Sequence, residues 1–308
     1  MVWPVSGQFN GLDCYRAPAN NREGLGTGIV PVREDRGLLM GDAMDLGLSG
    51  KRALVSGSTL GIGRAIAQSL AKEGASVIVN GRDADRVEQA VADISTVGTA
   101  SGFAADLSTA EGARDLAAFA TQDGAVDILV NNAGMFTVNE FFDIEDADWQ
   151  AMFDLNVMSA VRLSRALMPA MLERDWGRVL FIGSDQSSKP NPSMAHYAMT
   201  KTALVSIARS LAERTRETGV TVNTLQVAPT WTDGVDAFMQ QMAEIEGTTP
   251  EEMSKGYFAE GEGQTSLLQR WAHPEEIAAV ATFLCSPQSS AINGSAPRAD
   301  GGMVRSLF

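Results

Sequence analysis

The chain has 308 residues with 38 acidic and 24 basic side chains, which gives it a formal net charge of −14. Such a surface repels phosphate backbones and anionic lipids, so we expect neither nucleic-acid nor membrane binding. With 44% hydrophobic and 20% charged residues, the composition is that of an ordinary globular protein, which excludes disorder throughout.

Cysteine content and the N-terminus bear on location. Cys14 and Cys285 are too few for a disulfide scaffold, and neither lies in a Cys or His cluster suited to zinc. The chain lacks the basic start and apolar stretch of a secretory signal, and no run of roughly 18 apolar residues predicts a membrane span. We therefore expect a cytoplasmic protein without a metal site.

Residues 1–43 differ in composition from the rest of the chain. Gly, Pro, Asn and Arg are scattered through them without a helical or strand period. Five acidic residues argue against a transit peptide, because such peptides are poor in acid. We interpret this segment as an extension outside the fold, either disordered or upstream of a true start at Met44, and expect residues 44–308 to form one domain.

From Lys51 onward, apolar strand-like runs alternate with helix-length segments. The runs are RALVS (52–56), SVIVN (76–80), SGFAA (101–105), VDILV (126–130), RVLFI (178–182) and VTVNTLQV (220–227). Strands separated by helices favour right-handed crossovers. The pattern therefore predicts a single doubly wound α/β domain, with a mainly parallel sheet flanked by helices on both faces.

A glycine-rich turn joins the first run to the first helical pattern. Its residues are Gly57, Ser58, Thr59, Leu60, Gly61, Ile62 and Gly63. Glycines let the main chain approach a pyrophosphate, and the free N–H groups and positive dipole end of the following helix bind negative charge. In this strand, turn and helix context, the pattern predicts a Rossmann-type dinucleotide site.

The end of the second strand bears on which nucleotide is bound. The chain reads Asn80, Gly81, Arg82 and Asp83 there. An arginine accommodates the 2′-phosphate of NADP, whereas an acidic residue accepts hydrogen bonds from the ribose of NAD. We favour NADP through Arg82, with Asp83 as the alternative ribose acceptor. Arg64, after the glycine turn, is either a second contact or a solvated residue of the first helical turn.

Tyr197 and Lys201 stand four residues apart in a helical pattern, which places both side chains on one face. A tyrosine hydroxyl titrates near pKa ~10, so a neighbouring cation is needed to make it an acid or base at neutral pH. Ser184 follows the fifth run, which also suits a serine hydrolase. The chain has only two histidines and no Gly-x-Ser-x-Gly around Ser184, which argues against hydrolysis.

Several motifs together resemble the short-chain dehydrogenase/reductase family. The glycine turn, preceded by Ser56, resembles TGxxxGIG, and Asn131 to Gly134 match NNAG. Ser184, thirteen residues before Tyr197-x-x-x-Lys201, resembles the family's Ser…Tyr-x-x-x-Lys arrangement. The matches span nearly all of residues 48–302.

This resemblance implies roles for individual residues. Tyr197 is the acid/base, Lys201 stabilises the tyrosinate and holds the nicotinamide ribose, Ser184 binds the substrate oxygen, and Asn156 maintains a water chain. The cofactor shell also includes Asp106 and Leu107, whose alternative is a helix N-cap role for Asp106 or Ser108. The remaining members of this shell are Asn132, Ala133, Gly134 and Thr232.

One segment departs from the family pattern. Val227 and Ala228 stand where Pro-Gly is expected, with Pro229 two residues late, while Thr232 falls at the expected threonine. The loss of glycine is predicted to narrow the room beside the nicotinamide or to tilt the following loop. Activity is expected to survive, because the threonine and the four catalytic residues remain.

Residues 230–270 correspond to the family's substrate lid and include Phe238, Met239, Met242, Tyr257 and Leu267. Asp185, Gln186 and His196 are candidates for the substrate pocket or for capping positions. Motifs at 292–294 and 300–302 resemble the family's closing strand, which implies a homotetramer or a dimer. We expect an NAD(P)-dependent oxidoreductase acting on a small secondary alcohol or ketone. The alternative is a catalytically weak nucleotide sensor.

Overall fold

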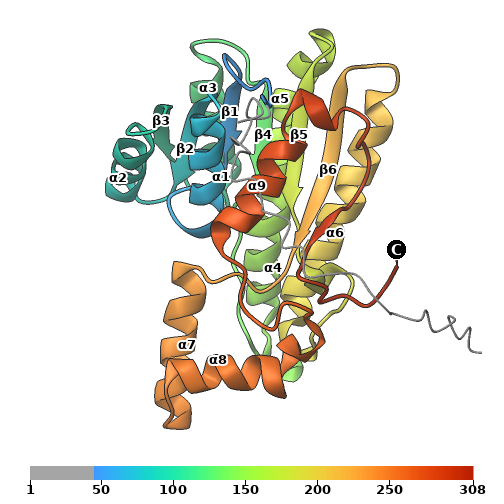
Figure 1. Cartoon of the computed structure of the whole chain (residues 1–308). Coiled ribbons are helices and arrows are strands. Elements are labelled where there is room, and N and C mark those ends of the chain that lie inside the picture. The colour runs from blue at the N-terminus through green and yellow to red at the C-terminus, as the bar shows by residue number, and fades with distance from the viewer. Residues whose placement is uncertain (1–44, 308) are drawn as a thin grey trace, which may run out of the picture. The chain divides into compact units, whose positions relative to one another are not determined.

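The strands of this computed structural model, which describes residues 45–307, form one seven-stranded parallel sheet (Figure 1). Their order across the sheet is β3-β2-β1-β4-β5-β6-β7. The strands are β1 (Arg52–Val55), β2 (Ser76–Gly81), β3 (Thr99–Ala104), β4 (Ile128–Asn131), β5 (Gly177–Ile182), β6 (Val220–Val227) and β7 (Arg298–Ala299). All six predicted runs form strands and the predicted fold class is confirmed; the predicted extension, residues 1–43, lies outside the described residues.

Helices cross between consecutive strands and cover both faces of the sheet (Figure 1). They are α1 (Gly61–Lys72), α2 (Ala84–Ile94), α3 (Ala110–Thr121), α4 (Asp146–Phe153), α5 (Ser159–Glu173), α6 (Ala195–Ala212), α7 (Asp233–Glu246), α8 (Pro250–Ala259) and α9 (Pro274–Leu284). A π-helical turn, Asp154–Met158, joins α4 to α5. None of the helices in residues 45–307 has the length and apolar character needed to cross a membrane.

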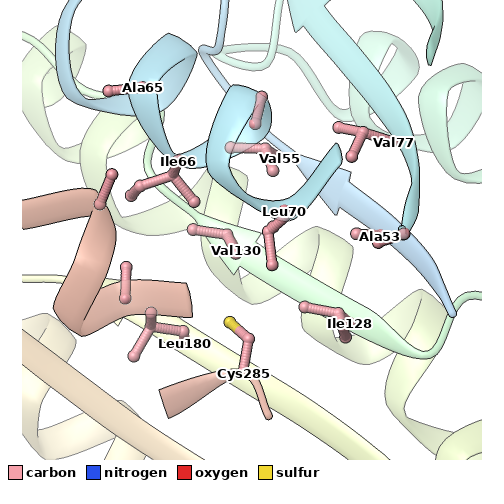
Figure 2. Close-up of a cluster of buried hydrophobic side chains, with 14 of the residues drawn as sticks. Ala53, Val55, Ala65, Ile66, Leu70, Val77, Ile128, Val130, Leu180 and Cys285 are labelled. Carbon is pink, nitrogen blue, oxygen red and sulfur yellow. The ribbon is translucent and has the colours of Figure 1, made fainter. Parts of the chain in front are cut away.

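The core consists of two apolar layers, one on each face of the sheet. On one face, α1, α2 and α9 pack on the strands, and Figure 2 shows Ile66 and Leu70 of α1 over Val55 and Val130. On the other face, α3, α5 and α6 form the second layer. Every residue of β4, β5 and β6 is buried, as expected for parallel strands covered on both faces.

The strand order reverses between β1 and β4, because the chain runs outward from β1 to β3 and then returns to continue at β4. In an open parallel sheet, a crevice forms at the carboxyl ends of the strands on either side of this reversal. The glycine turn follows β1 there, and Asn132 to Gly134 follow β4. Helices α7 and α8, inserted after β6, lie beyond this end of the sheet (Figure 1).

Candidate active site

The glycine turn after β1 takes a backbone conformation that requires glycine. Gly57 has φ 61° and Gly61 has φ 55°. A Cβ atom at Gly57 would lie 2.8 Å from the Cα atom of Ala133, a contact with main chain that a side chain could not relieve. Both positions therefore need glycine because of their backbone conformation. At Gly57 there is also no space for a side chain.

Polar side chains hold the turn against the end of β4. The Ser56 Oγ atom accepts hydrogen bonds from the main-chain N–H groups of Asn132 (2.9 Å) and Ala133 (3.0 Å). The Asn132 amide donates to the carbonyls of Ser56 (3.0 Å) and Gly57 (2.8 Å). Asn132 therefore fixes the shape of the turn, and Ser56 holds the turn against the loop after β4. The sequence suggested no role for Ser56 beyond its position in the glycine motif.

A cleft of about 840 Å³ lies between the glycine turn and the ends of β2, β3 and β4. The predicted cofactor residues that line it are Gly57, Thr59, Leu60, Gly61, Ile62, Gly63, Arg82, Leu107, Asn132, Ala133, Gly134 and Thr232. The start of α1 also faces it, with the N–H groups and dipole that suit a pyrophosphate. The donor set and the size of the cleft fit a dinucleotide.

Two predicted cofactor residues have their polar groups engaged elsewhere. Ser58 is buried, and its hydroxyl donates to the Val55 carbonyl (2.7 Å). The Asp106 carboxylate accepts from the main-chain N–H (3.0 Å) and the hydroxyl (2.8 Å) of Ser108, and the first of these bonds is the main cause that lowers its pKa. The alternative cap role was wrong in detail, because Thr109 is the N-cap of α3.

At the end of β2, Asn80 is buried and serves the main chain. Its amide donates to the Phe103 carbonyl (3.1 Å), and its Oδ1 atom accepts from Gly57 N (3.3 Å). Asp83 caps α2 by accepting from the N–H of Arg86 (3.0 Å). This capping bond engages one oxygen of the carboxylate that was the alternative ribose acceptor. Asp83 lines the cleft together with Arg82 and Arg86.

Arg64 was predicted to be either a cofactor contact or a solvated residue. Its guanidinium pairs with the carboxylate of Asp93 on α2, and both side chains are about one third exposed. It does not line the cleft of about 840 Å³. Arg64 therefore links α1 to α2.

Tyr197 and Lys201 lie one turn apart on α6, as the spacing predicts. The Lys201 Nζ atom is 5.5 Å from the centre of the Tyr197 ring and donates to the Ile182 carbonyl (2.9 Å). Burial lowers the pKa of Lys201 to about 8 and raises the pKa of Tyr197 to about 12, the latter opposed by a hydrogen bond with Ser184. Tyr197 is therefore protonated at neutral pH, and the neighbouring Lys201 ammonium loses its proton at a lower pH than an exposed lysine does.

Ser184 follows β5 and faces the same cavity as Tyr197. Its hydroxyl donates to Oδ1 of Asp185 (3.0 Å) and accepts from Gln186 N (3.2 Å). Asp185 is 5% exposed, and this burial raises its pKa to about 6. A carboxylate therefore orients the serine hydroxyl, a feature that the sequence did not predict.

Asn156 lies in the π-helical turn before α5, not in a regular helix. Its Oδ1 atom accepts from Met135 N (2.8 Å), and its Nδ2 atom donates to the Met135 carbonyl (2.9 Å) and to Thr200 Oγ1 (3.1 Å). Thr200 directly precedes Lys201, so Asn156 ties the strand-end loop that carries Gly134 to the catalytic helix.

A second cavity, of about 360 Å³, adjoins the cleft and contains the reactive side chains Ser184 and Tyr197. Ile62, Phe136 and Thr232 line both spaces, so the two meet at these residues. Thr232 caps α7 by accepting from Val235 N (3.3 Å). A nucleotide in the cleft and a small molecule in the cavity would therefore meet beside Tyr197.

Several pocket predictions can be placed. Asp185 and Gln186 line the second cavity, and so do Val227 and Ala228, the residues in place of Pro-Gly. His196 does not line it: the ring is fully buried, with Nε2 2.7 Å from Thr137 Oγ1, and burial lowers its pKa.

The segment 230–270 supplies Phe238, Met239 and Tyr257 to the cavity, whereas Leu267 and Leu268 are exposed. Sequence reasoning did not select Phe136, Glu262 and Trp271, which also line it. These residues carry no local motif, and only the folded chain brings them together.

Comparisons with known proteins agree with this geometry. The family model of the short chain dehydrogenases matches residues 51–243. The chain is 47% identical to the uncharacterized oxidoreductase YvrD of Bacillus subtilis, over 86% of this chain and all of the relative. It is 34% identical to D-beta-hydroxybutyrate dehydrogenase of Cupriavidus necator, over 83% of this chain and 99% of the relative.

A solved structure, L-sorbose reductase of Gluconobacter frateurii in complex with NADPH and L-sorbose, superposes with a TM-score of 0.80 at 32% identity. The match covers 86% of this chain and all of that one. The chain therefore belongs to the short-chain dehydrogenase/reductase family, as an NAD(P)-dependent oxidoreductase that acts on CH–OH and C=O groups.

Proposed function

We propose that the protein is an NADP(H)-dependent reductase of small ketones, with Tyr197, Lys201, Ser184 and Asn156 as its working residues. The observation that carries the proposal is the junction of the two spaces. Tyr197 and Ser184 face the smaller cavity, which shares Ile62, Phe136 and Thr232 with the cleft under the glycine turn. Bound there, the nicotinamide cofactor supplies or accepts a hydride.

The side chains then divide the proton chemistry. During reduction, the Tyr197 hydroxyl donates its proton to the substrate oxygen. Ser184 donates a hydrogen bond to the same oxygen as charge develops on it, in exchange for the bond that its hydroxyl gives to Asp185. The Lys201 ammonium stabilises the resulting tyrosinate by its charge. Asn156 acts through its bonds to the Met135 main chain and to Thr200, as a positioning residue for the proton path.

The cleft residues suit a nucleotide held by main chain and cations. The turn from Gly57 to Gly63 and the start of α1 would hold the pyrophosphate, and Asn132 to Gly134 would line the nicotinamide side. Arg82, supported by Arg86, would bind the 2′-phosphate of NADP. The capping bond of Asp83 and the neutral end of β2 favour NADP over NAD.

A cytoplasmic location and a homo-oligomer, a tetramer before a dimer, complete the proposal. The oligomer is supported by the residues at 292–294 and 300–302, which flank β7 at the edge of the sheet. Size-exclusion chromatography with light scattering measures this state directly, and a monomer at micromolar concentration would contradict it.

The test is a titration with NADPH and NADH, followed by absorbance at the nicotinamide band with a panel of acyclic, cyclic and sugar ketones. The proposal predicts tight NADPH binding and consumption with at least one ketone. Binding without consumption across the panel would favour the rival function, a nucleotide sensor in which Val227 and Ala228 have impaired turnover. Absence of binding would reject the cofactor assignment.

A further inference from the structure

The charged side chains that line the cavity beside Tyr197 are both acidic, and the ammonium of Lys201 lies 5.5 Å from the centre of the Tyr197 ring. Two carboxylates line the cavity, Asp185 from the end of β5 and Glu262 from the turn after α8, and none of its lining residues is Lys, Arg or His. The two acidic residues are 77 positions apart in the chain, so the fold alone brings them together.

These charges are only partly compensated. Lys189 lies near enough to oppose the pKa rise of Asp185, but its Nζ atom donates to the main-chain carbonyl of Glu262 (2.9 Å) and to Thr265 (3.1 Å). The Glu262 carboxylate accepts one long bond from the Gln186 amide (3.5 Å). Burial is the main cause that raises the pKa values of Asp185 and Tyr257, and the charge of Glu262 adds to both shifts.

The lining of the cavity also includes several aromatic side chains. Phe136 and Phe238 meet edge to face with ring centres 6.1 Å apart, and Tyr257 stacks on Trp271 at 4.7 Å. Aromatic faces pack against the C–H surface of a carbon chain, whereas carboxylates accept hydrogen bonds from hydroxyl groups. The Gln186 amide and the Tyr257 hydroxyl add groups that can bind substrate hydroxyls.

We propose that the substrate is an uncharged polyhydroxy ketone and its product the corresponding polyol, with substrate hydroxyls donating to Asp185 and Glu262. The inference rests on the reductase function proposed above. The ketone carbon receives the hydride, its oxygen receives the Tyr197 proton, and the cofactor leaves oxidised. A carboxylate on the substrate is rejected, because a like charge placed beside these two carboxylates, of which Asp185 is buried, is strongly repelled.

The test uses two ketoses that differ only in charge. L-Sorbose and 5-keto-D-gluconate share one skeleton, but a primary alcohol in the first is a carboxylate in the second. Wild-type enzyme with NADPH is expected to show a kcat/KM for L-sorbose roughly a hundredfold above that for the acid. Ethyl acetoacetate and acetoacetate form a second, unhydroxylated pair, with the same expected order.

The matched variants are Glu262→Gln and Glu260→Gln. Removing the charge of Glu262 is expected to shrink the uncharged-to-anionic ratio about tenfold. Glu260 is exposed at the end of α8 and does not line the cavity, so its variant should leave the ratio unchanged. Because the ratio is taken within one variant, a general loss of activity cancels.

The outcomes separate the inference from the function on which it rests. Consumption of no ketone with either cofactor rejects the reductase itself. Turnover of ethyl acetoacetate without L-sorbose rejects the polyhydroxy class, and equal use of the anionic partners rejects the charge argument. A preference of tenfold or more for 1-amino-1-deoxy-D-fructose over D-fructose would replace the uncharged substrate with a cationic one.

Discussion

The cleft under the glycine turn is centred on one local turn of the chain, whereas the cavity beside Tyr197 is formed by side chains from distant segments. Ser56 and Asn132 clamp one local turn against the end of β4. The cavity combines the ends of β5 and β6 with α7, α8 and the turn that carries Glu262. A site centred on a glycine turn can be predicted from neighbouring residues in the sequence. The shape and charge of a side-chain cavity depend on residues that lie far apart in the sequence.

The largest expected effect on the cleft comes from Gly57→Ala. The added Cβ atom would lie 2.8 Å from the Ala133 Cα atom at a φ of 61°, so the turn must shift. We expect the Kd for NADPH to rise by about a hundredfold. Fluorescence titration measures it, with Gly256→Ala on α8 as the control, because nothing lies within 4 Å of a Cβ there. An unchanged Kd for the Gly57→Ala variant would contradict the view that the cleft depends on the conformation of this turn.

On the substrate side, the largest effect on stability is expected from Lys201→Met. Burial lowers the pKa of Lys201 from 10.5 to about 8, so the charged lysine lowers the free energy of unfolding at pH 7. Methionine removes this burial penalty but also loses the hydrogen bond to the Ile182 carbonyl. The net effect should be a stabilisation of about 2 kcal/mol, while activity is lost.

The pH dependence of this gain has a definite sign. At pH 7 the lysine is charged in both folded and unfolded protein, so its full cost is present. Between the folded pKa of about 8 and the unfolded value of 10.5, the unfolded chain binds more protons and stability rises with pH. Denaturant unfolding at pH 7 and near pH 9.5 should show the gain shrinking, and exposed Lys72→Met should show none. A gain that grows with pH would contradict the burial argument.

The smallest expected effect is on the choice of cofactor. Arg82→Ala removes a cation from the mouth of the cleft, so the preference for NADPH over NADH should fall about tenfold. Arg114→Ala, on the exposed side of α3, is the matched control. A wild-type enzyme that prefers NADH more than tenfold would overturn the NADP assignment outright.

The sequence predicts well what local physics determines. The six apolar runs form strands, and all but β3 are largely buried. Gly57 and Gly61 of the predicted turn carry positive φ, and the spacing of Tyr197 and Lys201 places them one turn apart. Each of these signals is contained within a few neighbouring residues, which is why one amino-acid sequence is enough to predict it.

Long-range partnerships could not be predicted in the same way. Nothing near Glu262 in the sequence shows that it will share a cavity with Asp185. His196 is adjacent to Tyr197 in the sequence, but its ring is buried and lies against Thr137. The cap of α3 falls on Thr109 because its hydroxyl reaches Gly112, a choice between adjacent polar residues that spacing leaves open. Such details depend on packing between elements.

The most direct test of the account compares binding and chemistry in Tyr197→Phe. The account predicts that the Kd for NADPH stays within about twofold of wild type, while the rate of NADPH consumption with a reducible ketone falls about a thousandfold. That result would place the proton donor in the cavity and the nucleotide in the cleft, as two separable functions. A variant that turns over at a near-normal rate would contradict the assignment of Tyr197 as the acid.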